Sequence, residues 1–131
     1  MPLQPNIALE TIKALADRRQ IESHETDDLI FTAGDPGECL YAIIEGTVTI
    51  EWGKGIYELL QAGDCFGFDV MVDPERRRYC SAKAASPLKL LPMNREDFLL
   101  AIQELPMFAL ENLRAIDERL RRLKTKDASN P

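Results

Sequence analysis

The dipeptide Gly-Asp occurs twice in this sequence, as Gly34-Asp35 and Gly63-Asp64, and each copy interrupts segments rich in strand-forming residues. Glycine reaches left-handed or tightly bent backbone without the steric cost of a Cβ, so both copies predict turns. Residues 41–50 predict a strand with a turn or bulge at Gly46, and the alternation continues to Trp52. Gly53-Lys54-Gly55 then predicts a hairpin connection to an antiparallel return at residues 56–60. Short strands separated by such turns are typical of β-rolls and barrels.

Helical patterns flank the predicted strands. A strand-like run at residues 79–91 leads to Asn94, an expected N-cap with Asp97 at the third helical position, and Pro106 interrupts the helix that follows. The sequence therefore predicts a mainly β fold with flanking helices, a double-stranded β-helix or jelly roll with a short N-terminal helix and C-terminal helices. The expected parts of this single domain, 1–131, are a helix at 6–20, a β-roll at 21–92, helices at 94–124 and a fraying tail at 125–131.

Charge and composition exclude several classes of function. A net charge of -6 and a pI near 4.8 oppose nucleic-acid binding, which depends largely on basic groups at the phosphates. No apolar run is long enough to cross a bilayer and no signal-peptide pattern opens the chain, so no membrane partner is expected and the predicted location is cytoplasmic. His24 is the only histidine and the three cysteines are scattered, which predicts no metal site and no disulfide framework.

A resemblance to the cyclic-nucleotide-binding domain family is carried by residues 30–48 and by Gly63-Asp64-Cys65-Phe66-Gly67. The resemblance implies a regulatory β-roll without catalytic activity and a phosphate-binding cassette at residues 66–81. Backbone amides and one arginine of that cassette would hold a cyclic phosphate, and a glutamate would hold the ribose hydroxyl. The implied ligand is cyclic AMP or cyclic GMP, with no other cofactor. The backbone is expected to be left-handed or tightly bent at Gly34, Gly46, Gly63 and Gly67.

The resemblance transfers to this cassette residue by residue. Arg78 takes the place of the phosphate-binding arginine, and Arg76 or Arg77 would take it in a shifted loop. The family's glutamate falls on Phe68, which cannot accept a hydrogen bond, and Asp69 replaces it only if the local backbone is reshaped. The implied ligand-binding residues are Phe66, Gly67, Phe68, Asp69, Val70, Arg78, Tyr79, Cys80 and Ser81.

The main candidates also have structural interpretations. Arg78 could be a solvated charge paired with Asp73 or Glu75, and Asp69 could be a helix-start or turn carboxylate. Phe68 could fill either the pocket or the core.

Two functions follow from this sequence. The leading one is a stand-alone regulatory module that binds a small anion, such as a cyclic nucleotide, and shifts its terminal helices. The alternative is a degenerate scaffold for protein interaction or dimerisation, which the bulky Phe68 and Tyr79 favour. No nucleophile stands beside a base in a recognisable motif, so an enzyme is not expected, and DNA binding through a helix-turn-helix after the terminal helix is not expected either. That helix carries a stripe that predicts either a homodimer seam or packing on its own roll: Leu113, Ile116, Leu120 and Leu123.

Overall fold

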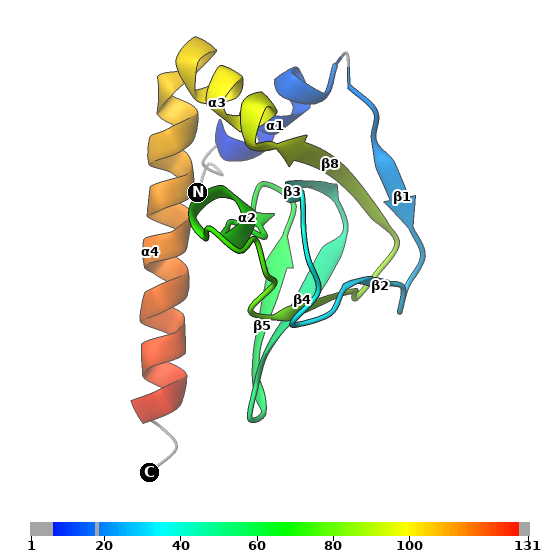
Figure 1. The fold of residues 1–131 in the computed structure, drawn as a ribbon, viewed down its shortest axis with the longest axis vertical. Coiled ribbons are helices and arrows are strands. Elements are labelled where there is room, and N and C mark those ends of the chain that lie inside the picture. Colours follow the sequence, from blue (N-terminus) through cyan, green and yellow to red (C-terminus); the bar gives the residue numbers. More distant parts are fainter. Residues whose placement is uncertain (1–6, 18, 129–131) are drawn as a thin grey trace, which may run out of the picture.

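The computed structural model describes residues 7–17 and 19–128, which form an antiparallel β-roll with helices on one side (Figure 1). The strands are β1 (Glu22–His24), β2 (Leu29–Phe31), β3 (Cys39–Glu45), β4 (Thr47–Gly53), β5 (Ile56–Gln61), β6 (Cys65–Phe66), β7 (Ser81–Ala84) and β8 (Leu88–Asn94). The helices are α1 (Ile7–Ala16), α2 (Asp69–Val72), α3 (Arg95–Glu104) and α4 (Pro106–Ala128). The expected jelly roll with flanking helices is confirmed.

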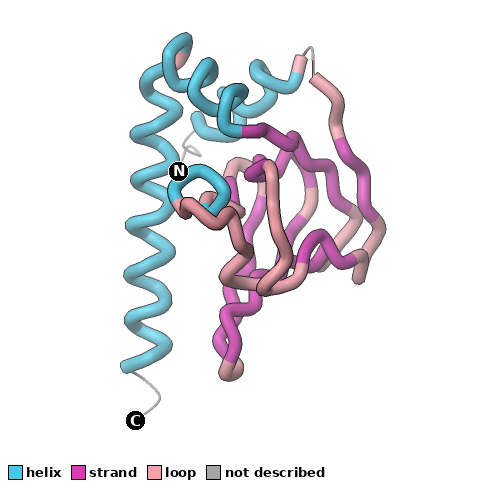
Figure 2. The backbone as a smooth tube through the Cα atoms, in the orientation of Figure 1, coloured by secondary structure: helices cyan, strands magenta, loops and turns pink. Residues whose placement is uncertain are grey.

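Two four-stranded sheets make up the roll, one in the order β1-β8-β3-β6 and the other in the order β2-β7-β4-β5. Every strand pair in both sheets is antiparallel. The helices α1, α3 and α4 gather beside the first sheet, and α2 lies between α4 and the roll (Figures 1 and 2). The β6–β7 connection, which contains α2, therefore lies between the helical layer and the roll.

The strand β3 faces a different core on each side. Its residue Ile43 packs inside the roll, whereas Leu40 and Ala42 pack against the helices. This alternation is the period of two expected for a strand covered on both faces. The first sheet is thus buried between the roll interior and the helical layer.

Three turns of the roll share one arrangement. The Oδ2 atom of Asp35 accepts a hydrogen bond from the Thr32 amide at 3.1 Å, and Asp64 accepts one in the same way from Gln61 at 2.9 Å. The predicted left-handed backbone is present at Gly34, Gly46, Gly63 and Gly67, whose φ angles are +93°, +95°, +98° and +85°. The third turn lacks glycine: Asp28 accepts from the Glu25 amide at 2.9 Å, and Asp27 has a φ of +74°.

The turn or bulge expected at Gly46 divides the strand-like run at residues 41–52 into two strands that belong to two sheets. Gly46 separates β3 from β4, and a Cβ at this position would lie 2.1 Å from the carbonyl oxygen of Pro87. The strand-like run at 79–91 is likewise divided into β7 and β8. A chain that changes sheet needs a sharp bend, and here the neighbouring backbone leaves no room for a side chain at the bend.

The helix ends differ from the expected ones in two places. The N-terminal helix ends at Ala16 rather than at residue 20. The backbone amide of Arg19 donates to the Ala16 carbonyl three residues before it, which forms a turn in place of a further helical hydrogen bond. The last helix continues to Ala128 instead of ending at 124; the Thr125 hydroxyl bonds back to the Arg121 carbonyl at 3.0 Å, and no Gly or Pro interrupts residues 125–128. Residues 129–131 of the expected tail lie outside the described part.

The start of α3 agrees with the sequence. Asn94 caps the helix by accepting from the Asp97 amide at 2.8 Å, and the Asp97 side chain accepts from the Asn94 amide in return. None of the helices in the described ranges combines the length and apolar character that a bilayer crossing requires.

Candidate functional site

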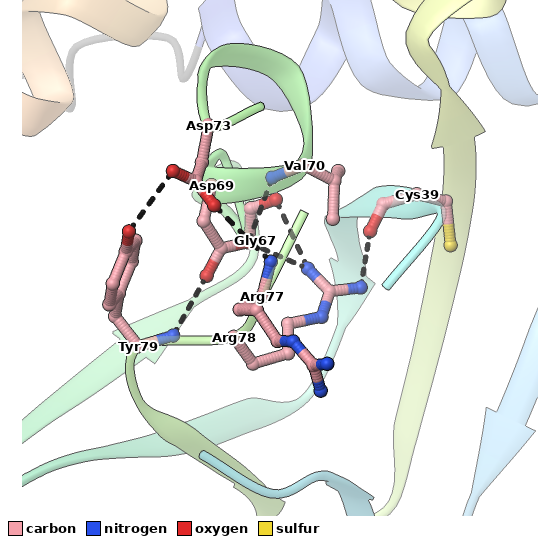
Figure 3. Close-up of polar contacts among 8 residues, drawn as sticks. All are labelled: Cys39, Gly67, Asp69, Val70, Asp73, Arg77, Arg78 and Tyr79. Atoms are coloured by element: carbon pink, nitrogen blue, oxygen red, sulfur yellow. Dashed lines mark hydrogen bonds and ion pairs between the residues drawn. The ribbon is translucent and has the colours of Figure 1, made fainter. Parts of the chain in front are cut away.

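The cassette at residues 66–81 begins with a glycine turn. Gly67 adopts a φ of +85°, which directs the chain out of β6 and into the single turn of α2. After α2 the chain returns through Asp73 and Arg78 to β7. This return places the Arg78 side chain beneath Gly67 (Figure 3). The site is therefore built by two short segments that face each other across the cassette.

Arg78 is the buried arginine of the cassette. Its side chain is 3% exposed, so the interpretation of Arg78 as a solvated surface charge is wrong. The Nη2 atom donates to the Cys39 carbonyl at 2.6 Å, and Nη1 donates to the Gly67 carbonyl at 3.2 Å and to Asp69 Oδ1 at 3.1 Å. Figure 3 shows these three contacts converging on the guanidinium. A buried charge is tolerated only when it is paired and hydrogen-bonded in this way.

Two glycines make room for this guanidinium. A Cβ at Gly37 would lie 2.5 Å from Arg78 Nε, and a Cβ at Gly67 would lie 2.7 Å from Nη1. The Phe31 ring lies beneath the guanidinium, with 4.2 Å between Cζ and the ring centroid. This close contact is a favourable cation–π arrangement. Arg78 Nε is buried and has no hydrogen-bond partner among the described residues, so the guanidinium keeps donor capacity that the chain does not use.

Asp69 is the carboxylate of the site. It is the first residue of α2, its side chain is 9% exposed, and it accepts from the Val70 amide at 3.0 Å and from the Tyr79 amide at 3.1 Å in addition to Arg78. The interpretation of Asp69 as a helix-start carboxylate is therefore confirmed. The ion pair with Arg78 is a contact that the sequence did not indicate.

The other two cassette arginines lie on the surface. Arg77 donates to the Gly34 carbonyl at 3.0 Å, and Arg76 has a strained φ of +53°. Tyr79 is 61% exposed and donates its hydroxyl to Asp73 Oδ1 at 3.1 Å. That hydrogen bond raises the pKa of the Tyr79 phenol. Of the three neighbouring arginines, the interior of the roll holds Arg78.

Phe68 faces the helices. Its ring makes an edge contact with Phe98 of α3 at a centroid distance of 6.1 Å, and it packs against the helix-side core. Of the two roles that the sequence left open, Phe68 thus takes the core one, and the expectation that it contacts a ligand beside Arg78 gains no support. The ring centroid of Phe98 in turn lies 5.9 Å from that of Phe108 on α4.

The remaining candidates are mostly committed to the fold. Phe66 and Cys80 are buried in the roll interior, and burial raises the pKa of the Cys80 thiol to about 11. The Ser81 hydroxyl accepts from the Ala33 amide at 2.9 Å. Val70 is 3% exposed and offers its amide to Asp69. The backbone amides of Val70 and Tyr79, more than these side chains, can therefore contribute to a site.

Three contributors to the site were missed by sequence reasoning: Gly37, Phe31 and the Cys39 carbonyl. Gly37 carries a signal, because it belongs to the motif at residues 34–37, but its packing against Arg78 becomes visible only in three dimensions. A backbone carbonyl leaves no trace in the sequence. Burial raises the pKa of the Cys39 thiol, so this group is no reactive thiolate at neutral pH.

A depression of about 240 Å³ lies between α2 and the start of α3, and its lining residues are Glu38, Val70, Arg76, Asn94, Arg95 and Glu96. Its charges are mixed, two basic and two acidic. Within the described ranges, no group of three or more His, Cys, Asp or Glu side chains gathers where it could hold a metal ion.

An antiparallel roll with an arginine-bearing cassette beneath a helical cap defines a class of small regulatory domains. A family model described as "Cyclic nucleotide-binding domain" matches residues 21–104, and the chain belongs to this family. The resemblance that the sequence indicated is thereby confirmed.

Relatives of known name agree with this assignment. The Cyclic AMP receptor protein of Thermus thermophilus is 32% identical over 131 residues, which cover 96% of this chain and 59% of the relative. The Global nitrogen regulator of a Nostoc species is 29% identical over 106 residues, which cover 76% of this chain and 48% of the relative. The chain thus spans about half the length of these two relatives.

A solved structure shows the same fold. The crystal structure of the Thermus thermophilus Catabolite Activator Protein matches with a TM-score of 0.68 and 30% identity, over 89% of this chain and 57% of that one. The family is regulatory, and this chain is a regulatory ligand-binding module of it.

Proposed function

We propose that this domain binds a small anion, with a cyclic nucleotide as the first candidate, and transmits its binding to the terminal helices. The observation that carries the proposal is the buried guanidinium of Arg78, which lies between Gly37 and Gly67 and whose Nε has no hydrogen-bond partner in the part of the chain that the structure describes. A guanidinium with free donors suits phosphate oxygens. One relative is named a cyclic AMP receptor protein, which supports cyclic AMP as the first ligand to test.

The donors available to a phosphate are Arg78 and the amides of Val70 and Tyr79, which already converge on one carboxylate. The candidate site is therefore the cassette from Phe66 to Val70 together with residues 78–81. Phe68 offers no acceptor for a ribose hydroxyl, and its ring points into the helical layer. A ligand here would depend on its phosphate more than on its sugar.

A chain of aromatic rings connects the cassette to the helices. Phe68 contacts Phe98 of α3, and Phe98 contacts Phe108, which is 1% exposed at the start of α4. Packed rings move together because cores are close-packed and resist local compression. An anion that repositions the cassette would in this way change the position of α4, by binding one helix arrangement more tightly than the other.

Calorimetric titration with cyclic AMP and with cyclic GMP tests the binding step. The informative variant is Arg78→Lys, which keeps the charge and most of the volume but loses the planar fork. Loss of one charge-assisted hydrogen bond costs about 1.5–3 kcal/mol, so we expect affinity to fall by about tenfold or more. The matched control is Arg77→Ala, which removes a neighbouring arginine that lies on the surface and should bind as the parent does.

A linked measurement guards against misfolding of the variant. Saturating ligand should raise the melting temperature of the parent by clearly more than that of Arg78→Lys, since the stabilisation depends on the ratio of ligand concentration to the dissociation constant. Absence of heat with both nucleotides, together with an unchanged melting temperature at millimolar ligand, would rule out cyclic-nucleotide binding.

A second candidate function is that of an interaction scaffold. The rings of Phe31, Tyr41 and Phe66 pack together inside the roll, with centroids 5.5–6.3 Å apart, next to the guanidinium. On α4, Leu113 and Leu120 are 62% and 61% exposed. An apolar stripe in solvent favours self-association, and sedimentation of the parent and of Leu120→Glu tests it.

A further inference from the structure

The Asp69 carboxylate collects the donors that an anion would need. Its Oδ1 atom accepts from the Val70 amide at 3.0 Å and from Arg78 Nη1 at 3.1 Å, and its Oδ2 atom accepts from the Tyr79 amide at 3.1 Å (Figure 3). One guanidinium and two backbone amides thus surround a single carboxylate. This donor set has the composition of an anion site, and it is already occupied by a side chain of the same cassette.

The pair is also balanced in charge. Arg78 and Asp69 are 3% and 9% exposed at their side chains, so solvent screens them little and each neutralises the other. An incoming anion that left Asp69 in place would bring a second negative charge against this carboxylate. Such a like-charge contact at low dielectric is strongly unfavourable.

Some donor capacity remains at the guanidinium. Arg78 Nε is buried without a hydrogen-bond partner among the described residues, whereas Nη1 donates to Asp69 and the Gly67 carbonyl and Nη2 donates to the Cys39 carbonyl. A buried unpartnered N–H is costly and is a recognised mark of a site that an additional group completes. The carboxylate therefore satisfies the site only in part.

The segment that carries Asp69 is short, and its C-terminal end is exposed. The helix α2 is one turn long, its N-cap Phe68 makes no capping hydrogen bond through its side chain, and Val72 at its end is 80% exposed. A single helical turn with an exposed end belongs to the less stable elements of a fold, although Val70 and Phe68 are packed against the core. Rotation of Asp69 would release the Tyr79 amide and the Arg78 Nη1 atom together.

We infer that Asp69 is an intramolecular competitor, a carboxylate that occupies the anion site of this domain at rest and that a phosphate-bearing ligand must displace. The inference rests on the proposed function and adds its regulation. Displacement breaks the Asp69–Arg78 ion pair and forms a phosphate–Arg78 pair in its place. The free energy of breaking the internal pair is subtracted from the affinity, so the resting domain binds its ligand weakly and the movement of Asp69 accompanies binding.

Removing the negative charge at position 69 tests this directly. Titration calorimetry with cyclic AMP, and separately with inorganic phosphate, compares the parent with Asp69→Asn and with Asp69→Ser, a smaller residue that keeps the experiment informative if the asparagine variant folds poorly. We expect both variants to bind cyclic AMP at least about tenfold more tightly, which corresponds to ~1.4 kcal/mol. A parallel gain with inorganic phosphate would show that the competition concerns the anion and not the base or sugar.

The matched control is Glu75→Gln, which removes the same charge from an exposed position in the same cassette. It should change the affinity by less than about twofold, because exposed charges are screened. If the parent binds and the position-69 variants bind equally or more weakly, Asp69 is a positioning residue and no competitor, and the proposed function survives. If the variants bind where the parent does not, the competitor is supported. If no form binds either probe, both ideas are overturned.

Discussion

At the scale of single residues, one turn geometry occurs three times, and its central position is filled in two ways. Gly34 and Gly63 hold the left-handed position in two turns, whereas Asp27 holds it in the third at a φ of +74°. Aspartate is among the few side chains that visit this region without a large steric cost. The ion pair of Asp27 with Lys83, 3.7 Å apart and exposed at both ends, adds little to stability.

Substitutions at three positions with left-handed backbone should lower the free energy of unfolding by different amounts, because a different physical effect acts at each. Gly34→Ala adds a Cβ that meets nothing within 4 Å, so it should cost only the backbone strain of about 1–2 kcal/mol. Gly46→Ala should cost more, because its Cβ would also collide with the Pro87 carbonyl at 2.1 Å. Asp27→Gly should change the free energy of unfolding by less than about 0.5 kcal/mol, since relief of strain is offset by unfolded-state entropy.

Urea unfolding monitored by circular dichroism gives this ranking. An equal loss for Gly34→Ala and Gly46→Ala would show that the contact with Pro87 relaxes freely, and that backbone conformation alone determines both costs.

These turns also explain what the sequence could predict. Glycine with aspartate is a visible signal, so the turns at Gly34 and Gly63 and the hairpin at Gly53-Lys54-Gly55 were predicted from the residues alone. The turn at Asp27 was not, because nothing marks an aspartate as left-handed. The same limit applies to the site: Arg78 was found through its place in a motif, but its pairing with Asp69 depends on how the cassette folds back on itself.

At the scale of elements, α4 is fixed to the roll by a buried ion pair that no local pattern predicted, since its partners are far apart in the chain. Arg119 of α4 donates to both oxygens of Glu58 on β5, at 2.9 and 3.0 Å, and Trp52 of β4 donates its indole N–H to the same carboxylate. The two ionic side chains are 12% and 6% exposed. A two-pronged arginine–carboxylate contact restricts geometry as well as distance, so it sets how α4 lies on the hairpin.

This clamp should make stability depend on acid pH. Burial opposes the charged form of Glu58, but the hydrogen bonds from Arg119 and Trp52 outweigh it, and the pKa of Glu58 is lowered. A carboxyl whose pKa is lower in the folded state contributes stability above its unfolded pKa of about 4.3, and loses it as pH falls through the folded value. The variant Glu58→Gln should be less stable than the parent by about 1–3 kcal/mol at pH 7, and the difference should shrink below about pH 4.

Thermal unfolding from pH 7 down to about pH 3 measures this difference, with Trp52, the only tryptophan, as the fluorescent reporter at the clamp itself. Glu118→Gln is the matched control, because Glu118 pairs with Arg114 on the outer surface of the same helix. A constant gap between parent and Glu58→Gln at all pH values would mean that Glu58 stabilises by packing and not by charge.

At the scale of the whole molecule, the long helix has one face on the roll and another in water. Phe108 and Asn112 are buried against the body of the domain, whereas Leu113 and Leu120 are about 60% exposed and Ile116 and Leu123 are partly so. The expectation that the stripe packs on its own roll therefore fails for Leu113 and Leu120. Ion pairs four residues apart, Arg114–Glu118 and Arg121–Asp117, lie beside the stripe.

The stripe therefore predicts a parallel or antiparallel pairing of α4 with a second copy. About two heptads bury too little surface to hold two free helices together, but here each helix is already fixed to a folded roll by Arg119, which removes much of the ordering cost.

Sedimentation equilibrium should find masses above 14.8 kDa at micromolar concentration. The variant Leu120→Glu should weaken self-association by about tenfold or more, because it buries an unpaired charge at the seam. Arg114→Glu adds the same side chain outside the stripe and should leave the equilibrium nearly unchanged. If parent and Leu120→Glu have one monomeric mass at every concentration, the exposed leucines serve another partner, and the anion site must act on α4 within a single copy.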